Sequence, residues 1–440
     1  MLITLAAPAF AETWYIENGD ITVKAGETGN DVTQNNVTTK NDTDTIITNQ
    51  KTDTASSNTV TIDAGSDKVE VTLKDVNIDT SSRNKAAVSV TGSGNTTIKL
   101  DGDNHLTGGN GIYSNSIGSL TISGGTVKAA GGDGSDGGSG ISSSSGVTVS
   151  DGTVTANGGN STGSYGSGGD GIRSDGGVTI SDGTVTAKGG NGDSKDGYGG
   201  DGIRSGGVVT ISGNTVNAAG GYGGKVGGYG ICSFDRVAIS GGTVEAAGGN
   251  GSTGGGSGIY SSVIDLSGSL ELTAKAGSPN GKALSQNGSE LVLDTIKDKL
   301  GPGAKVTATD ADGKVNQVSI PRPVEPEESS SSSGGGSAAP SAPASPLPGL
   351  TVTDKDGQRI TYTSTQSGNT LTVCVGRFTA SFRISLAALR QLRAEGIETI
   401  TFQTILCSTT LSVDELLAMG GEDAEAVLTH RFTDSSLTVG

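Results

Sequence analysis

The side chains of this chain that could bind a ligand gather in glycine-rich stretches between short apolar segments. Aromatic rings and carboxylates on an exposed edge are what a sugar site or a bridging Ca²⁺ site would use. The candidate sugar-binding residues are Tyr165, Tyr198, Tyr222 and Tyr229, and the candidate calcium ligands are Asp170, Asp193, Asp196 and Asp201. The alternative is that these residues only form solvated turns, in which glycine supplies positive φ and aspartate bonds to the backbone.

Arginine occupies the same position in two neighbouring repeats, at Arg173 and Arg204. If the repeats stack, the two guanidinium groups lie roughly 5 Å apart on one face. Their planar forks could then hold the carboxylates of uronic acids. The alternative is a pair of exposed arginines neutralised by Asp170 and Asp201, each two residues before the isoleucine of its repeat.

Catalysis is not expected from the remaining polar residues. The chain has only two histidines, which are too few to favour a histidine-based zinc site or Ser-His or Cys-His catalysis. Hydrolysis of a glycan would need two or three carboxylates held about 5 to 9.5 Å apart in a groove. The best candidates, Asp151 and Asp182, lie in Ser-Asp-Gly turns whose counterparts in other repeats are glycines. A pectin lyase or hydrolase is therefore the minor alternative.

A repeat must position these residues. A Gly-Ile step recurs every 28 to 31 residues, and a serine follows each isoleucine two positions later; the isoleucines are Ile112, Ile141, Ile172, Ile203, Ile231 and Ile259. Each copy continues with a short alternating strand and then, in most copies, with a Gly-Thr-Val segment. Such units must stack, because one unit cannot bury its apolar stripe alone. The sequence predicts an all-β fold, a right-handed single-stranded parallel β-helix with three strands per coil and superposed isoleucines.

The composition divides the chain into five segments. Residues 1–11 end in Ala9-Phe10-Ala11 and are typical of a signal-peptide remnant. The expected segments after it are an N-terminal cap with the first strands at 12–58, the β-helix at 59–320, a disordered Pro/Ser/Gly linker at 321–349 and a small α+β domain at 350–440. In the last segment, Ser385 and Ser412 are expected to cap two helices.

The charge and the apolar content limit the partners. The chain carries a net charge of −17, and it lacks the clustered Lys and Arg that binding to nucleic acid requires. No run approaches the roughly 20 apolar residues of a membrane helix. An acidic, aromatic-poor chain with an export signal suits a secreted protein, with cell-surface or cell-envelope association left open.

The succession of residues 100–109 (LDGDNHLTGG), Gly111-Ile112 and 122–126 (ISGGT) has a known counterpart. It resembles a family of secreted carbohydrate-binding right-handed β-helix proteins of Gram-positive bacteria, over roughly residues 14–310. The resemblance implies Ca²⁺-assisted binding of an acidic polysaccharide of the polygalacturonate (pectin) type. A bridging cation also makes physical sense, because an acidic protein repels an acidic glycan. The rival expectation is a structural adhesin whose β-helix is only a stalk.

Overall fold

The computed structural model describes residues 11–321 and 349–439, apart from 193–194, 355–357, 361, 368, 376, 378, 405–407, 422–423 and 431–434. The expected signal-peptide remnant lies outside the described residues except for Ala11, and so does the expected linker except for its first and last residues. The chain divides into two compact units, residues 1–325 and 326–440, each described here by itself.

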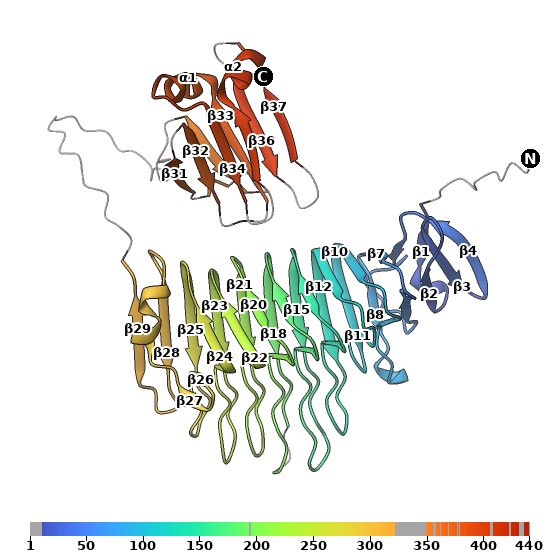
Figure 1. Ribbon diagram of the computed structural model, residues 1–440. Helices are drawn as coiled ribbons and strands as arrows, with labels where there is room; N and C mark the ends of the chain where they lie inside the picture. Colours follow the sequence, from blue (N-terminus) through green and yellow to red (C-terminus); the bar gives the residue numbers. More distant parts are fainter. Residues whose placement is uncertain are drawn as a thin grey trace, which may run out of the picture. The chain divides into compact units, whose positions relative to one another are not determined.

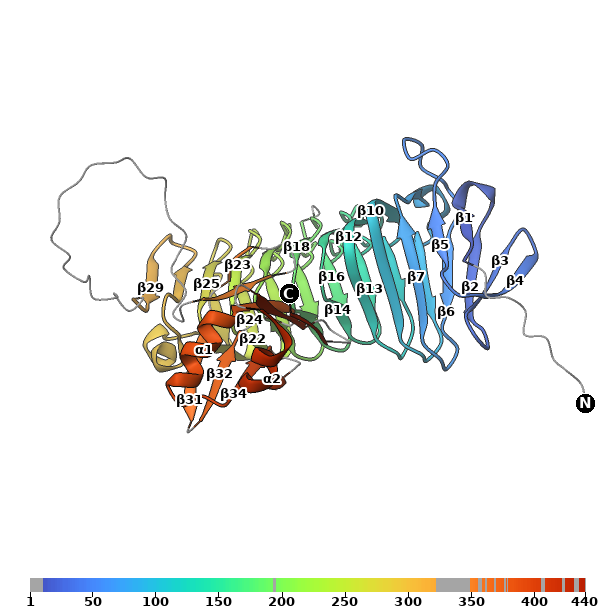
Figure 2. The same cartoon turned by 90° about the horizontal axis from the view of Figure 1, so that it is seen from above.

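The first unit is a parallel β-solenoid of about 11 turns (Figures 1 and 2). Three rows of parallel strands run along it, as the repeat predicts. The first row is β2 (Ile21–Ala25), β6 (Val60–Asp63), β9 (Val88–Thr91), β11 (Ile112–Ser114), β13 (Ile141–Ser143), β16 (Ile172–Ser174), β19 (Ile203–Ser205), β22 (Ile231–Ile239), β24 (Ile259–Leu266) and β26 (Leu284–Gln286).

The other two rows share the long strands β10 (Thr96–Gly108) and β12 (Leu120–Gly131), which turn the corner between them. The second row also contains β1 (Thr13–Tyr15), β5 (Ile46–Thr48), β7 (Val69–Lys74), β14 (Val147–Val149), β17 (Val178–Ile180), β20 (Val209–Ile211) and the C-terminal parts of β22 and β24. The third contains β8 (Asn77–Asp79), β15 (Thr153–Asn157), β18 (Thr184–Lys188), β21 (Thr215–Ala219), β23 (Gly242–Ala247), β25 (Leu270–Lys275) and β28 (Lys305–Thr309).

Antiparallel strands and short helices sit at the ends. β3 (Asn30–Gln34) and β4 (Val37–Asp42) fold back on β2, so residues 12–58 supply both coil strands and the hairpin beside them. β27 (Ser289–Glu290), the 3-10 helix η3 (Leu293–Lys299) and β29 (Val315–Ser319) finish the stack. Two further 3-10 turns, η1 (Ile16–Asn18) and η2 (Ser81–Arg83), interrupt the N-terminal coils.

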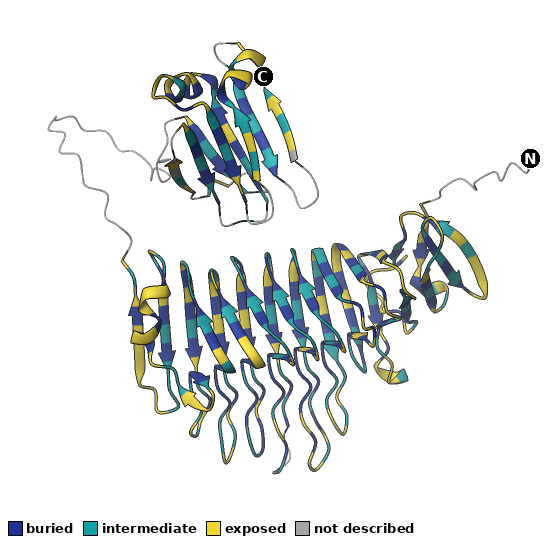
Figure 3. Ribbon diagram, viewed as in Figure 1, coloured by how far each residue is buried: buried dark blue, intermediate teal, exposed yellow. Residues whose placement is uncertain are grey.

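The core is a column of aliphatic side chains, and it confirms the predicted superposition. Ile112, Ile141, Ile172, Ile203, Ile231 and Ile259 pair in direct register and are fully buried. Burial alternates along each strand (Figure 3). The serine two residues later turns inward and bonds to the preceding coil: Ser205 Oγ donates to Gly176 O (2.8 Å) and Ser233 Oγ to Gly207 O (2.8 Å). The Ile-x-Ser signature thus joins an apolar stack to a hydrogen-bonded one.

The glycine-rich loops form a second ordered layer, which we call the glycine fin: residues 131–139, 158–170, 189–192, 195–201, 220–229 and 248–257. Figure 1 shows them projecting from one side of the solenoid. None of their glycines, all of which are described, has positive φ, so turn formation is not what requires glycine here. A Cβ on Gly190 would lie 1.9 Å from Gly159 O, and one on Gly221 would lie 1.9 Å from Gly190 O. Close backbone contact between coils requires the glycines.

The two arms of each fin loop are hydrogen-bonded to each other and to the next coil. Gly190 N donates to Gly169 O (2.8 Å), Gly200 N to Gly190 O (2.9 Å) and Gly221 N to Gly200 O (2.8 Å). Along the axis, Gly189 N donates to Ala219 O (2.8 Å). The backbone polar groups that open loops would leave to water are paired within the fin.

The second unit is a small α+β domain, as predicted. One sheet is β30 (Leu350–Thr353), β33 (Ala380–Ser385), β36 (Glu425–His430) and β37 (Ser435–Val439); the other is β31 (Thr363–Ser367), β32 (Thr370–Cys374), β34 (Thr399–Gln403) and β35 (Ser408–Ser412). Ser385 Oγ accepts from Ala388 N at the start of α1 (Leu386–Ala394), and Ser412 Oγ accepts from Glu415 N at the start of α2 (Val413–Met419). Both predicted caps are confirmed.

Candidate functional site

The residue after each core isoleucine, and after Val60 and Val88 in the preceding coils, points away from the core of the first strand row. We call this set the outer row: Thr61, Ser89, Tyr113, Ser142, Arg173, Arg204, Cys232 and Tyr260. Its members pair in direct register, so neighbours are separated by about 4.8 Å and the row extends over roughly 34 Å. The predicted alignment of Arg173 with Arg204 is confirmed.

A second set of residues, which we call the flanking row, lies beside the outer row, at the point where each returning fin arm meets the strand. It holds Asn110, Ser139, Asp170, Asp201, Tyr229 and Ser257, each two residues before a core isoleucine. Asp170 Oδ1 accepts from Asp201 N (2.7 Å), and Asp201 Oδ1 accepts from Tyr229 N (2.7 Å). Asn110 Oδ1 accepts from Ser139 N in the same way (2.7 Å). Three side chains of this row therefore tie their coil to the next.

Asp170 and Asp201 are buried carboxylates on adjacent coils, with 8% and 4% of their surfaces exposed. Burial is the largest cause that raises the pKa of both, and the charge of Asp170 adds to it for Asp201, whose pKa reaches about 7. The Arg204 guanidinium opposes the rise, with Nη1 3.4 Å from Asp201 Oδ2. The Asp201 carboxyl therefore gives up its proton at a higher pH than an ordinary aspartate does.

The two arginines of the outer row are chemically unequal. Arg204 is half-buried between Asp201 and the ring of Phe234, whose centroid lies 5.2 Å from Cζ. Arg173 keeps 49% of its side chain exposed, and Asp175 Oδ1 lies 3.7 Å from its Nε. The preceding aspartate pairs with Arg204, as the alternative considered from the sequence has it. Arg173 is the more exposed of the two and pairs with Asp175, while its charge also acts on Asp170.

Aromatic rings continue the site beyond Arg204. Tyr229 of the flanking row stacks on Tyr260 of the outer row, with centroids 4.9 Å apart and planes 17° apart. Burial raises the pKa of the Tyr229 hydroxyl to about 12. Between Arg204 and Tyr260 in the row, Cys232 is a fully buried free thiol whose pKa burial also raises. This end of the row offers an aromatic face, and the two row members beyond Arg204, Cys232 and Tyr260, are not Asp, Glu, Lys or Arg.

The other predicted tyrosines lie apart from this cluster. Tyr198 is in a returning fin arm, where the Lys225 ammonium lies 5.4 Å from its ring centroid. Tyr222 is in an outgoing arm, held by its N–H to Asn191 Oδ1 (2.9 Å). Tyr165 is 79% exposed. The structure thus brings together Tyr229, both arginines, Asp170 and Asp201, but not these three rings.

The expected Ca²⁺ ligands do not form one set in the part of the chain that the structure describes. Asp193 lies outside the described residues, and Asp196 sits near Lys225. Asp170 and Asp201 already accept backbone N–H groups and face Arg204, so a cation would have to displace these partners. Within the described ranges, no three His, Cys, Asp or Glu side chains lie together as metal ligands would. Asp170 and Asp201 do not fit a Ca²⁺ site.

The two carboxylates weighed for hydrolysis act in turns. Asp151 Oδ1 accepts from Gly152 N (2.6 Å), and Asp182 Oδ1 accepts from Gly183 N (2.8 Å). Both glycines have positive φ, which a turn at this position requires. The geometry agrees with the structural role that the glycine counterparts indicate.

Sequence reasoning missed Phe234 and the stacking role of Tyr260. The signal for Tyr260 was present, since it shares the slot of the two arginines. Phe234 follows the core Ser233 within β22, at an irregularity in the pairing with β24, and no repeat signature marks it.

No known protein family matches the chain, and no curated protein or solved structure matches it significantly. None of the helices in the described ranges has the length and apolar character needed to span a bilayer.

Proposed function

We propose that the protein is an exported, non-catalytic polysaccharide-binding protein that holds an acidic glycan along the outer row. The observation that carries the proposal is the alignment of Tyr113, Arg173, Arg204 and Tyr260 on one face of successive coils. A regular row suits a polymer, because each coil offers another contact one strand spacing further on. Arg173 would pair with a uronate carboxylate through its planar fork, and Tyr260 would face a sugar ring.

At physiological salt the overall charge of −17 opposes this arrangement only weakly. The Debye length is then about 8 Å, so distant carboxylates are screened while contacts at the row are not. Ca²⁺ is a separate part of the proposal: a cation shared by exposed carboxylates of protein and glycan would lower the remaining repulsion.

The sequence supports export and sugar binding independently of the geometry. The Ala9-Phe10-Ala11 site favours export, and residues 100–126 resemble secreted carbohydrate-binding β-helices. The same resemblance names polygalacturonate as the first ligand to test.

Affinity electrophoresis of the full-length chain tests the proposal. We expect a polygalacturonate gel to retard the wild type, and a gel of neutral galactan not to. Arg173→Gln should weaken retardation about tenfold, because it removes the exposed guanidinium of the row. Lys188→Gln is the matched control, since Lys188 is an exposed cation on β18 of the third strand row. An unretarded wild type, or equal retardation of Arg173→Gln, would contradict the proposal.

A structural stalk is the second candidate, and the glycine fin favours it. Close-packed, hydrogen-bonded loops stiffen a solenoid whether or not a ligand binds. A pure stalk predicts that Arg173→Gln leaves adhesion of the protein to cells or glycans unchanged.

A further inference from the structure

A pocket opens at the N-terminal end of the outer row. Its volume is about 480 Å³, within the range of small-molecule sites. Thr61, Ser89 and Tyr113, three successive members of the row, form one side, and the loop residues Asn84, Lys85 and Asn110 form another. The pocket is therefore continuous with the proposed glycan site. Unlike the rest of that site, it is bounded on a second side by loop residues, which form its wall.

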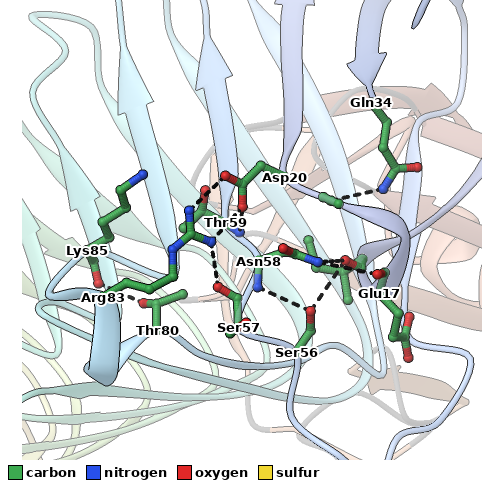
Figure 4. Close-up of polar contacts among 12 residues, drawn as sticks. Glu17, Asp20, Gln34, Ser56, Ser57, Asn58, Thr59, Thr80, Arg83 and Lys85 are labelled. Carbon is green, nitrogen blue, oxygen red and sulfur yellow. Dashed lines mark hydrogen bonds and ion pairs between the residues drawn. The ribbon is translucent and has the colours of Figure 1, made fainter. Parts of the chain in front are cut away.

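The wall is held rigidly by the segment around η2 (Figure 4). Arg83 donates from Nη1 and Nη2 to the two Asp20 carboxylate oxygens (2.8 and 2.9 Å) and from Nη1 to Ser57 O (2.7 Å). The hydrogen bond from Arg83 is the largest cause that lowers the pKa of Asp20 to about 2. This bidentate pair fastens the segment across neighbouring coils.

The backbone of Lys85 is fixed, while its side chain is not. The Lys85 carbonyl accepts from Thr80 Oγ1 (2.7 Å) and from Gly109 N (2.7 Å). Its ammonium group is exposed, and among the described residues no carboxylate lies within ion-pair distance. Lys85 is also the one charged residue that lines the pocket. A single unneutralised cation, carried by a fixed stretch of backbone, favours a ligand with one anionic group.

The other lining groups suit a polyhydroxylated ring. Thr61, Ser89 and Tyr113 carry hydroxyls, and Asn84 and Asn110 carry amides, which both donate and accept. Tyr113 is 38% exposed, so part of its ring is free to lie against a flat ligand. One carboxylate, several hydroxyls and a ring together describe a uronic acid.

We propose that this pocket is a subsite for one carboxylated sugar unit and anchors one end of the bound glycan. The part of this inference that concerns the polymer rests on the proposed function; the binding of a single sugar in the pocket does not. Arg173 follows Tyr113 by two coils, about 10 Å along the row. A monosaccharide in the pocket therefore contacts Lys85 without reaching Arg173, whereas a polymer contacts both.

Saturation-transfer NMR and calorimetry with galacturonate monosaccharide and with polygalacturonate separate the two sites, using the full chain. We expect Lys85→Gln to weaken monosaccharide binding at least tenfold and Arg173→Gln to leave it unchanged. Both variants should weaken polymer binding. Ser89→Leu, which fills the pocket side formed by the row, should reproduce the effect of Lys85→Gln, and unchanged melting temperatures would show that the variants fold.

The outcomes distinguish the pocket from the function. If the wild type binds polymer but not monosaccharide, or if Arg173→Gln weakens monosaccharide binding as much as Lys85→Gln does, the pocket is not the subsite and the proposed function stands. If neither ligand binds, both fail. If galactose binds as well as galacturonate, or galactose 6-sulfate binds and galacturonate does not, the carboxylate assignment is wrong.

Discussion

At the scale of single residues, the flanking row shows one hydrogen-bonding role filled by two chemistries. Asn110, Asp170 and Asp201 each accept a backbone N–H of the next coil through Oδ1. The amide does so without charge, whereas the two aspartates bring buried carboxylates one coil apart. The raised pKa of Asp201 means that its ionised form is destabilised by folding.

Asp201→Asn should therefore stabilise the protein at alkaline pH. The folded pKa of Asp201, about 7, lies above its ordinary value of 3.8, so the carboxyl favours folding below pH 4 and this contribution is lost as pH rises through 7. The amide keeps the bond to Tyr229, as Asn110 does to Ser139. We expect the variant to gain on the order of 1 kcal/mol at pH 8 and little at pH 4, measured by urea unfolding.

Asp133→Asn is the control for this pH dependence. Asp133 also accepts a backbone N–H from the next coil, that of Asn160 (2.6 Å), but it is exposed. Equal gains in the two variants, or a gain for Asp201→Asn that is larger at pH 4, would show that the buried charge is not the cause.

At the scale of elements, the glycine fin is the part of the fold that depends most on backbone contact. Its arms hydrogen-bond to one another, and their backbones lie so close together that no space is left for a Cβ atom on the glycines. A side chain inserted there must push two coils apart, and the disturbance passes to the neighbouring loops because the arms are linked in series. The flanking row begins where these arms end, so the fin also positions Asp170, Asp201 and Tyr229.

Gly190→Ala should accordingly destabilise the solenoid. The new Cβ would lie 1.9 Å from Gly159 O in a contact made by backbone on both sides. Overpacking of this kind costs about 1–3 kcal/mol or more. Gly146→Ala is the matched control, since its Cβ would lie 3.6 Å from the nearest atom, Gly177 O. Thermal unfolding followed by circular dichroism compares them, and similar melting temperatures would contradict the close packing of the fin.

The sequence predicts the coils better than the fin or the site. The spacing of Ile141, Ile172 and Ile203 predicts the register of their strands, because only one register places the three isoleucines over one another in an apolar column. Glycine usually signals a turn, as Gly152 and Gly183 do with their positive φ. Position 190 requires glycine because the backbone of the adjacent coil lies so close to it. The residues next to Gly190 in the sequence do not show this contact.

For the site, the alignment of Arg173 with Arg204 follows from the repeat. The neutralisation of Arg204 and the stacking of Tyr229 on Tyr260 depend on side-chain contacts between coils. The pocket depends on a segment, residues 80–86, that departs from the repeat, so periodicity could not predict it.

At the scale of the whole molecule, two electrostatic effects of opposite sign act on an acidic glycan. The net charge of −17 repels it over long distances, while Arg173 and Lys85 attract it at contact. The two effects differ in range, so salt separates them: the Debye length is about 30 Å at 0.01 M and about 3 Å at 1 M.

Affinity for polygalacturonate should therefore pass through a maximum with ionic strength. Between 0.01 and about 0.15 M NaCl, screening removes the long-range repulsion and binding should tighten several-fold; towards 1 M, the contact attractions are screened as well and binding should weaken. Arg173→Gln should lower the maximal affinity without changing the range of salt concentration over which the affinity increases. A bridging role for Ca²⁺ would appear as tighter binding than NaCl of equal ionic strength produces, reversed by EDTA. A steady fall from the lowest salt would mean that local cations outweigh the acidic surface at every distance, and a steady rise to 1 M would mean that Arg173 and Lys85 make no ionic contact with the glycan.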